Sequence, residues 1–265
     1  MTNFIKVFLA LTLIVIFQVD SYGFEKKINL GNWSQGEVES IIKKSSQSGS
    51  SRQKINSLSS HFLGTEYQGN TLIGGPHEEE VFVVNLSKVD CFTFLDYMEA
   101  FRYSASFPEF EKNLMNIRYK SGNVSYVDRN HFFTDWEKNN APLVDDVTLK
   151  VGRNKVKKVL KTLNLKKDGS KFLEGIPNKK RVLYYIPSDL IDENLIKRLK
   201  SGDYVGIYSK TEGLDVSHVG LLIKNEKEVL FRHASSRHKK VLDEGFLEYI
   251  AQKPGIIILR PRQGQ

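Results

Sequence analysis

The feature that most constrains this chain is the junction at Cys91, where a strand-like run gives way to a helical pattern. Val81 to Leu86 is mostly apolar and rich in valine, as buried strands are. After it, Phe92, Leu95 and Met98 recur at helical spacing, which places Cys91 in the first helical turn. Cys91 is the only cysteine in 265 residues. Because the positive end of a helix dipole stabilises a thiolate, Cys91 is a candidate nucleophile.

The size and charge of the chain limit the classes of protein to consider. A chain of 265 residues forms one large domain, or one domain with an insertion. The formal net charge of +8 and the pI near 9.3 favour an anionic partner or environment. The sequence has no zinc-ligand spacing and no basic helix with base-reading residues, so we expect an anionic cell envelope and no nucleic acid as its partner.

The first residues predict export from the cytoplasm. Thr2 to Lys6 is weakly basic, and Val7 to Phe17 is an apolar run too short for a comfortable membrane span. Ser21 and Gly23 are small residues at a suitable cleavage position. We therefore predict a signal peptide over residues 1–23 and a periplasmic or secreted protein, without a stable membrane anchor after cleavage. An uncleaved anchor is the alternative. A lone cysteine in an oxidising compartment is a liability, so we expect Cys91 either to be buried or to have a function.

The order of the predicted elements indicates the α+β class. Residues 24–60 form a predicted N-terminal helical region, in which Ser45 to Ser51 is a link between two helices or a helix end. From residue 204 onward, short apolar or alternating runs separated by turn residues predict an antiparallel sheet. Helices first and a sheet last is typical of an α+β fold.

Two of the six histidines lie where a base is needed. His218 opens one strand-like run and His233 lies near the end of the next, about seven residues before and six after a turn at Asn225 to Lys227. Antiparallel pairing therefore makes them neighbours at the far end of a hairpin. His218 would accept the proton of Cys91, and His233 would orient His218. Purely structural histidines are one alternative. A zinc site of Cys91, His218 and His233 is another, but no closely spaced ligand pair supports it.

These residues resemble a known family. Asp90 to Phe94, His218 to Gly220 and His233 to Ser235 are similar to segments of the NlpC-type cell-wall cysteine peptidases of the papain-like superfamily. A closer resemblance, from about Phe62 to Pro261, is to the branch described as N-acetylmuramoyl-L-alanine amidase-like. The motifs that carry it are Phe62 to Thr65, Val84 to Leu86, Asp90 to Cys91, Phe133 to Trp136 and Leu214 to Gly220.

The resemblance implies a papain-like α+β fold over residues 61–265, with N-terminal helices and the nucleophile helix packed on an antiparallel sheet. The long spacing between Cys91 and His218 implies an inserted subdomain at about 106–200. Cys91 matches the nucleophile of the family, His218 the base and His233 the third polar residue. Tyr67 matches a tyrosine of the oxyanion hole, although Glu66 stands where the family usually has proline. We expect Asp90 to cap the helix.

Further candidate residues concern the substrate. The stretch from Tyr119 to Trp136 mixes aromatic and polar side chains, as ligand clefts do. Arg129, Asp135 and Trp136 are therefore candidate substrate-binding residues, and a structural ion pair is the alternative for Arg129. Ser217, in the Leu214 to Gly220 motif beside His218, is a further candidate.

The resemblance also implies an activity. We expect a monomeric hydrolase that cleaves an amide bond in peptidoglycan or its fragments, either the muramoyl–L-alanine bond or a bond within the stem peptide. No metal or organic cofactor is required for that chemistry. A non-catalytic module that binds wall glycopeptide, and an acyltransferase on the same fold, are the alternatives.

Overall fold

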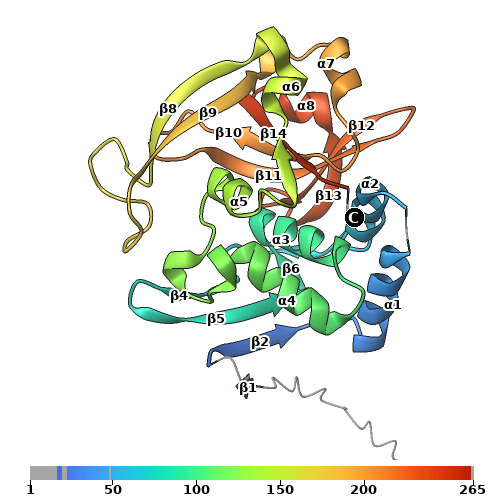
Figure 1. Ribbon diagram of the computed structural model, residues 1–265. Coiled ribbons are helices and arrows are strands. Elements are labelled where there is room, and N and C mark those ends of the chain that lie inside the picture. Colours follow the sequence, from blue (N-terminus) through green and yellow to red (C-terminus); the bar gives the residue numbers. More distant parts are fainter. Residues whose placement is uncertain (1–16, 20–22, 48, 264–265) are drawn as a thin grey trace, which may run out of the picture.

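The computed structural model describes residues 17–19, 23–47 and 49–263 (Figure 1). The predicted signal peptide, residues 1–23, therefore lies largely outside the described residues, and its cleavage stays a prediction. The described part forms β1 (Phe17–Val19), which pairs with β2 (Glu25–Asn29). Within the described ranges, none of the helices combines the length and apolar character that crossing a membrane requires.

A large sheet forms the centre of the C-terminal half (Figure 1). Its strands lie in the order β6-β3-β13-β12-β11-β10-β14-β9-β8, and β7 pairs with β14. Neighbouring strands are antiparallel except β3 and β6, which are parallel, so the sheet is mixed instead of purely antiparallel as expected. The strands are β3 (Glu66–Tyr67), β6 (Lys88–Val89), β7 (Val144–Asp146), β8 (Lys157–Leu163), β9 (Lys179–Pro187), β10 (Tyr204–Tyr208), β11 (Val216–Lys224), β12 (Val229–Ser235), β13 (Lys240–Gly245) and β14 (Gly255–Pro261).

A second, smaller sheet has the order β1-β2-β5-β4, with β4 (Ile73–Gly75) and β5 (Glu78–Asn85). The run predicted as a strand from Val81 to Leu86 covers the second half of β5, which ends one residue earlier, at Asn85. β2 pairs with β5 in parallel. Residues 24–60, which we expected to be helical, therefore also supply a strand.

The two helices predicted in residues 24–60 are present as α1 (Gln35–Ser46) and α2 (Ser51–Ser60). A capping box begins each of them: the hydroxyls of Ser34 and Ser50 accept a backbone N–H three residues later. Both helices pack against α3 (Cys91–Arg102), which in turn packs on β11 and β12. The helix that begins with Cys91 thus lies between the N-terminal helices and the sheet, as Figure 1 shows.

β11 contributes to the cores on both faces of the main sheet, because successive side chains of a strand point to opposite faces. Val219 and Leu221 pack in the core that contains α3. Leu222 packs with Phe231 on the opposite face, which α8 (Phe246–Ile250) covers. The first half of β11 therefore lies between α3 on one face of the sheet and α8 on the other.

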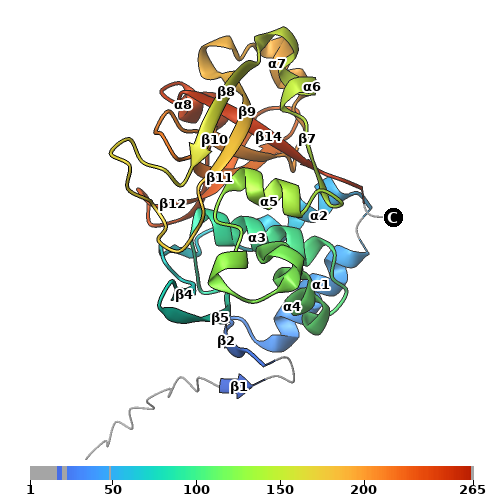
Figure 2. The ribbon, with the colours of Figure 1, turned by 60° about the vertical axis from the view of Figure 1, so that its left-hand side comes forward.

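The segment from about 106 to 200, expected as an inserted subdomain, extends the main sheet. β8 pairs with β9, and both β9 and β7 pair with β14 (Figure 2). The helices of this segment are α4 (Phe107–Arg118), α5 (Phe133–Asn139), α6 (Thr148–Gly152) and α7 (Glu193–Arg198), with 3-10 turns at Lys120–Gly122, Tyr126–Asp128, Arg153–Lys155 and Ser188–Leu190.

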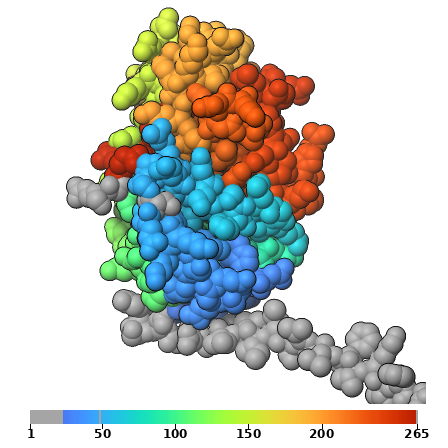
Figure 3. All heavy atoms as spheres, turned by 90° about the vertical axis from the view of Figure 1, so that its right-hand side faces the viewer, coloured from blue at the N-terminus to red at the C-terminus, as the bar shows by residue number. Residues whose placement is uncertain are grey.

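The N-terminal helices are held against the C-terminal strands. The Ser51 hydroxyl and the Arg102 guanidinium both donate to the Arg262 carbonyl, at 2.8 and 3.0 Å. Arg232 of β12 donates to the Ser59 hydroxyl at 3.0 Å. Figure 3 shows the N-terminal segment, in blue, directly against the orange and red C-terminal part.

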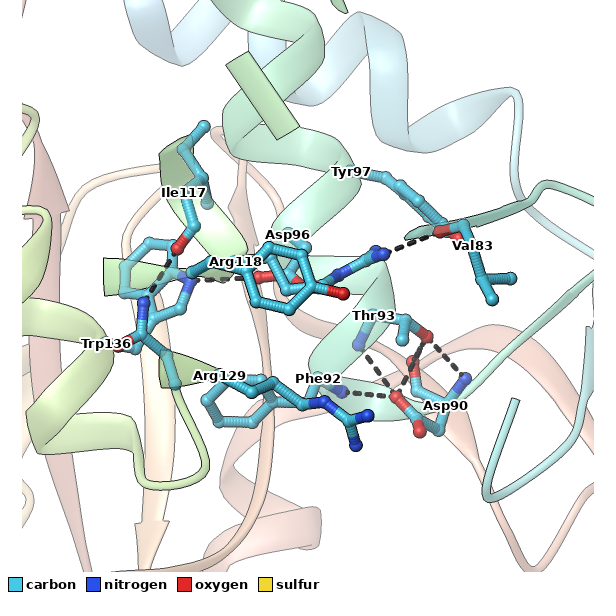
Figure 4. A network of polar contacts seen from close by, with 12 residues as sticks. Val83, Asp90, Phe92, Thr93, Asp96, Tyr97, Ile117, Arg118, Arg129 and Trp136 are labelled. Atoms are coloured by element: carbon cyan, nitrogen blue, oxygen red, sulfur yellow. Dashed lines mark hydrogen bonds and ion pairs between the residues drawn. The ribbon is translucent and has the colours of Figure 1, made fainter. Parts of the chain in front are cut away.

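A buried polar network fixes α4 and α5 on α3 (Figure 4). Arg118 of α4 donates from Nε to Asp96 of α3 at 2.9 Å, and Trp136 of α5 donates to the same carboxylate at 3.0 Å. Arg118 also donates to the Val83 carbonyl of β5 at 2.6 Å. Because an unpaired buried charge is costly, the network ties these elements to the helix that carries Cys91.

Candidate active site

The start of α3 is defined by a capping box that positions Cys91. Asp90 Oδ1 accepts the backbone N–H groups of Phe92 and Thr93, at 3.0 and 2.7 Å, and Thr93 Oγ1 accepts that of Asp90 (Figure 4). The predicted role of Asp90 as the helix cap is therefore confirmed. Cys91 is the first residue of the helix, as its sequence context predicted.

Cys91 is partly exposed and lines a cavity of about 330 Å³. Ser217, His218 and Val219 of β11 line the same cavity. The backbone of Val219, the residue that follows His218, lowers the pKa of the thiol, so it lies close to the sulfur. The structure thus brings the cysteine of α3 to the part of β11 that carries His218.

The opposite wall of this cavity is aromatic and comes from the 106–200 segment. Phe172 and Leu173 belong to the loop between β8 and β9, and Phe172 is 37% exposed. His131, Phe132 and Phe133 complete the wall. The expectation that the aromatic stretch lines a cleft therefore holds for these three residues.

Burial favours the neutral forms of both Cys91 and His218. Burial, followed by the charge of Asp90, raises the pKa of the Cys91 thiol to about 12. The backbone hydrogen bonds at Cys91, Phe92 and Val219 lower this pKa, so the expected thiolate stabilisation exists but is outweighed. Burial, followed by the charges of His233 and Lys253, lowers the pKa of His218 to about 3. Burial therefore favours a neutral thiol and a neutral imidazole in the one cavity that both residues line.

Two imidazoles and a carboxylate form a hydrogen-bonded chain across three strands. His218 Nε2 lies 2.8 Å from His233 Nδ1, and His233 Nε2 lies 2.7 Å from Oε2 of Glu244 on β13. A carboxylate only accepts, so His233 carries its proton on Nε2 and accepts at Nδ1. His218 then donates from Nε2, and its Nδ1 is left as the unprotonated nitrogen.

Aromatic packing fixes the orientation of both histidines. The Phe231 ring stacks on His233, with centroids 4.8 Å apart. Tyr249 of α8 lies 4.9 Å from His233 and 6.2 Å from His218, measured between ring centroids. The two imidazoles therefore have little freedom to rotate away from each other.

A second cavity, of about 630 Å³, lies on the Glu244 side of the histidines. His218 and Ser217 line this cavity and the Cys91 cavity as well. Its other walls include the cationic side chains of Arg237 and Lys253 and the ring of Tyr249. Ser217, a predicted substrate-binding residue, is exposed between the two cavities.

Tyr67 lies close to the cysteine. It pairs in parallel with Val89, two residues before Cys91. Burial raises the pKa of the Tyr67 hydroxyl, and the charges of Cys91 and Asp90 raise it further. The hydroxyl is therefore within electrostatic range of the thiol.

Like Tyr67, three further predicted substrate-binding residues line neither of these cavities. Arg129 pairs with Glu80, and Asp135 pairs with Arg181 and with Lys179, the latter at 3.0 Å. The alternative interpretation of Arg129, a structural ion pair, is thus what the structure contains.

Trp136 has no exposed surface and donates to Asp96 in the core. The expectation that Trp136 contacts a substrate was wrong, because a side chain without exposed surface cannot touch one. Its position in an aromatic and polar stretch reflects core packing around a polar network.

The sequence interpretation missed Glu244, Tyr249 and Phe172. A signal for Glu244 was present: in the register of β12 and β13 it lies opposite Phe231, two residues from His233 and on the same face. Tyr249 and Phe172 offered no local signal. Among the described residues, no group of three or more His, Cys, Asp or Glu side chains is arranged to hold a metal ion.

Comparison with known proteins supports the resemblance. Residues 57–256 match the family described as AmiA-like, N-acetylmuramoyl-L-alanine amidase-like. Among curated proteins, none matches the chain.

Several solved structures share the fold. Protein LPG0564 from Legionella pneumophila str. Philadelphia 1, of family DUF1460, is 23% identical with a TM-score of 0.73, over 86% of this chain and 95% of that one. An N-acetylmuramoyl-L-alanine amidase from Bacteroides uniformis ATCC 8492 is 25% identical with a TM-score of 0.65, over 77% and 97%. A Bacteroides fragilis protein whose name assigns it provisionally to the xylanases is 27% identical with a TM-score of 0.64, over 76% and 98%. The family match spans most of the sequence and the fold agrees with it, so this chain belongs to the N-acetylmuramoyl-L-alanine amidase-like family.

Proposed function

We propose that this chain is an exported cysteine hydrolase that cleaves an amide bond of peptidoglycan, either the muramoyl–L-alanine bond or one within the stem peptide. The observation that supports this most is the cavity shared by Cys91 and His218, with His233 and Glu244 bonded in series behind His218. The family description and the amidase name of the Bacteroides uniformis relative favour the same bond class.

In the proposed reaction, Nδ1 of His218 accepts the thiol proton while Cys91 sulfur bonds to the carbonyl carbon. His218 then returns that proton to the leaving nitrogen, the C–N bond breaks, and a thioester remains. Water loses a proton to the same imidazole and attacks the thioester, which releases the carboxylic acid and restores the thiol. Because the resting pair is neutral, proton transfer accompanies bond formation and does not precede it.

Two donors are available for the oxyanion that forms on the carbonyl carbon. The backbone N–H of Cys91 is at the open end of α3, where the first amides of a helix have no partner within the helix. The Tyr67 hydroxyl is the second donor, since it lies in electrostatic range of the thiol. Glu244 and His233 act as positioning residues, because they set the tautomer and orientation of His218.

Glycoside cleavage, which the name of the Bacteroides fragilis relative suggests, is less well supported. That chemistry normally uses two carboxyl groups on either side of the glycosidic bond. Of the described residues that line the Cys91 cavity, Asp215 alone has a carboxylate. It is buried and accepts the Thr134 backbone N–H and hydroxyl at 2.8 and 2.9 Å, so it serves the structure.

The decisive test is digestion of purified sacculi and soluble muropeptides, with fragments identified by mass spectrometry. We expect new fragments from the wild-type protein and background levels from Cys91→Ser and His218→Ala. His77→Ala is the matched control, because that imidazole is 83% exposed and outside both cavities. Intact stem peptides freed from muramic acid identify an amidase, and shortened stems identify an endopeptidase.

The same assay distinguishes the proposed hydrolase from the two alternatives, a binding module and an acyltransferase. A glycopeptide-binding module retains the fragments on the protein without cleaving them, and Cys91→Ser binds as well as the wild type. An acyltransferase joins the released acyl group to an added amine instead of water. The proposed export is tested by sequencing the N-terminus of the mature protein, which we expect to begin near Phe24.

A further inference from the structure

Positive charge is concentrated in one part of the chain, residues 150–181. This segment holds twelve lysines and arginines against two acidic residues, a formal charge of +10, whereas the whole chain carries +8. It includes β8 and the start of β9, and these two strands form the hairpin at one edge of the main sheet. Figures 1 and 2 show these strands side by side at the margin of the molecule.

The strand register divides the side chains of this hairpin between two faces. One face is directed inward and is mostly buried; there, Lys161 donates to the carbonyls of Thr211 and Leu214 at 2.8 and 2.7 Å. The other face is directed outward and has an apolar centre, with Leu160 65% exposed and Val182 45% exposed. The cross-strand pairs of this outer face are Lys158 with Tyr184, Leu160 with Val182, and Thr162 with Lys180.

The lysines of the outer face are free to meet a partner. Lys158 and Lys180 are exposed, and neither forms an ion pair with any described residue. The residues on either side of Lys180 are neutralised instead, because Lys179 and Arg181 both form ion pairs with Asp135. The outer face therefore presents two unneutralised cations on either side of an exposed leucine–valine pair.

We propose that this outer face, formed by Lys158, Leu160, Lys180 and Val182, docks on the surface of an anionic phospholipid bilayer. Cationic side chains are attracted to the negative headgroups, while neighbouring apolar side chains enter the boundary with the acyl chains. A soluble polyanion would engage only the lysines and leave Leu160 and Val182 in water. Lysines on an edge strand also discourage sheet-to-sheet pairing, but that role does not account for the exposed apolar pair.

Co-sedimentation of the full chain with vesicles tests the proposal. Phosphatidylcholine vesicles are compared with vesicles of equal parts phosphatidylcholine and phosphatidylglycerol, at low salt and at high salt. We expect a gain in binding on the anionic vesicles that high salt removes. The apolar run near the N-terminus is common to all variants, so differences between variants report on the hairpin.

Two double variants separate the contribution of the lysines to vesicle binding from that of the apolar pair. Lys158→Gln with Lys180→Gln should weaken binding to anionic vesicles about 25-fold, from about fivefold per lysine near a charged surface. Leu160→Thr with Val182→Thr keeps β-propensity and should weaken it about tenfold. Lys43→Gln with Lys227→Gln, at exposed lysines elsewhere, is the matched control and should bind like the wild type.

The proposal is overturned if both double variants bind anionic vesicles like the wild type. It is also overturned if the lysine variant alone loses binding and the wild type binds heparin equally well, since that identifies a site for soluble polyanions. Circular dichroism melts check folding. If a double variant melts early, the single changes Lys158→Gln and Leu160→Thr are measured instead, with about fivefold and threefold losses expected.

Discussion

The Nε2 atom of His218 lies 2.8 Å from Nδ1 of His233, although the two residues are fifteen positions apart in the chain. The hairpin brings them together: β11 and β12 pair from Leu221 with Arg232 to Lys224 with Val229. Continued by three residues, this register makes the histidines diagonal neighbours. The hydrogen bond then depends on the next strand, because Glu244 of β13 decides which nitrogen of His233 is protonated.

The first prediction concerns that carboxylate. Glu244→Gln should lower kcat about tenfold with little change in KM, because the neutral amide supports the developing imidazolium less well and can also donate, which reverses the tautomers. Steady-state kinetics on a soluble muropeptide measures it, with Glu226→Gln in the exposed hairpin turn as the control. An unchanged kcat would mean that Glu244 has no part in positioning His218.

The second prediction concerns pH. His218 must be neutral to accept a proton, so its lowered pKa of about 3 moves the acid limb of kcat/KM well below the usual value near 6.5. The raised pKa of the thiol, about 12, keeps the basic limb equally remote. We therefore expect kcat/KM to change less than about twofold between about pH 5 and pH 9. An acid limb near pH 6.5 would contradict a buried, neutral pair.

The third prediction tests the tyrosine beside the cysteine. Tyr67→Phe should reduce kcat by about 10²-fold if its hydroxyl donates to the oxyanion, a typical loss for one such donor. The burial of the ring is retained, so the melting temperature should hardly change. Tyr126→Phe, which removes the hydroxyl of a tyrosine that does not line the Cys91 cavity, is the control. Equal activity of Tyr67→Phe and the wild type would leave the backbone N–H of Cys91 as the proposed donor.

The fourth prediction concerns the wall built by the β8–β9 loop. Phe172→Ala removes a partly exposed ring from the Cys91 cavity and should raise KM about fivefold while kcat stays within about twofold. Val127→Ala, at a residue that is 62% exposed and outside this cavity, should leave both constants unchanged. A fall in kcat alone would show that the ring positions the reacting bond and does not simply contribute to binding.

The fifth prediction concerns stability. Asp96→Asn leaves the buried Arg118 guanidinium without its counter-charge and should lower the free energy of unfolding by about 3–5 kcal/mol. Urea unfolding followed by circular dichroism measures the loss. Asp145→Asn, whose ion pair with Arg262 is half exposed, should cost at most about 1 kcal/mol. Similar losses for the two variants would show that burial adds nothing to the Asp96–Arg118 pair.

Local patterns in the sequence were enough to predict the start of the Cys91 helix, its Asp90 cap and the contact between the two histidines. Each depends on periodicity over a few residues or on register counted from one short turn, and both can be read directly along the chain. The resemblance to the amidase-like family depended on motifs of the same local kind.

Only the tertiary structure decided which distant side chains surround Cys91. The cavity that Cys91 shares with Val219 and Phe172 joins segments far apart in sequence, and no short-range period encodes such packing. For the same reason Trp136 was misjudged: the sequence determined an aromatic residue beside polar ones, but only the packing of α5 on α3 decided that it is buried. The neutral resting state of Cys91 and His218 likewise follows from burial, which is a property of the assembled fold.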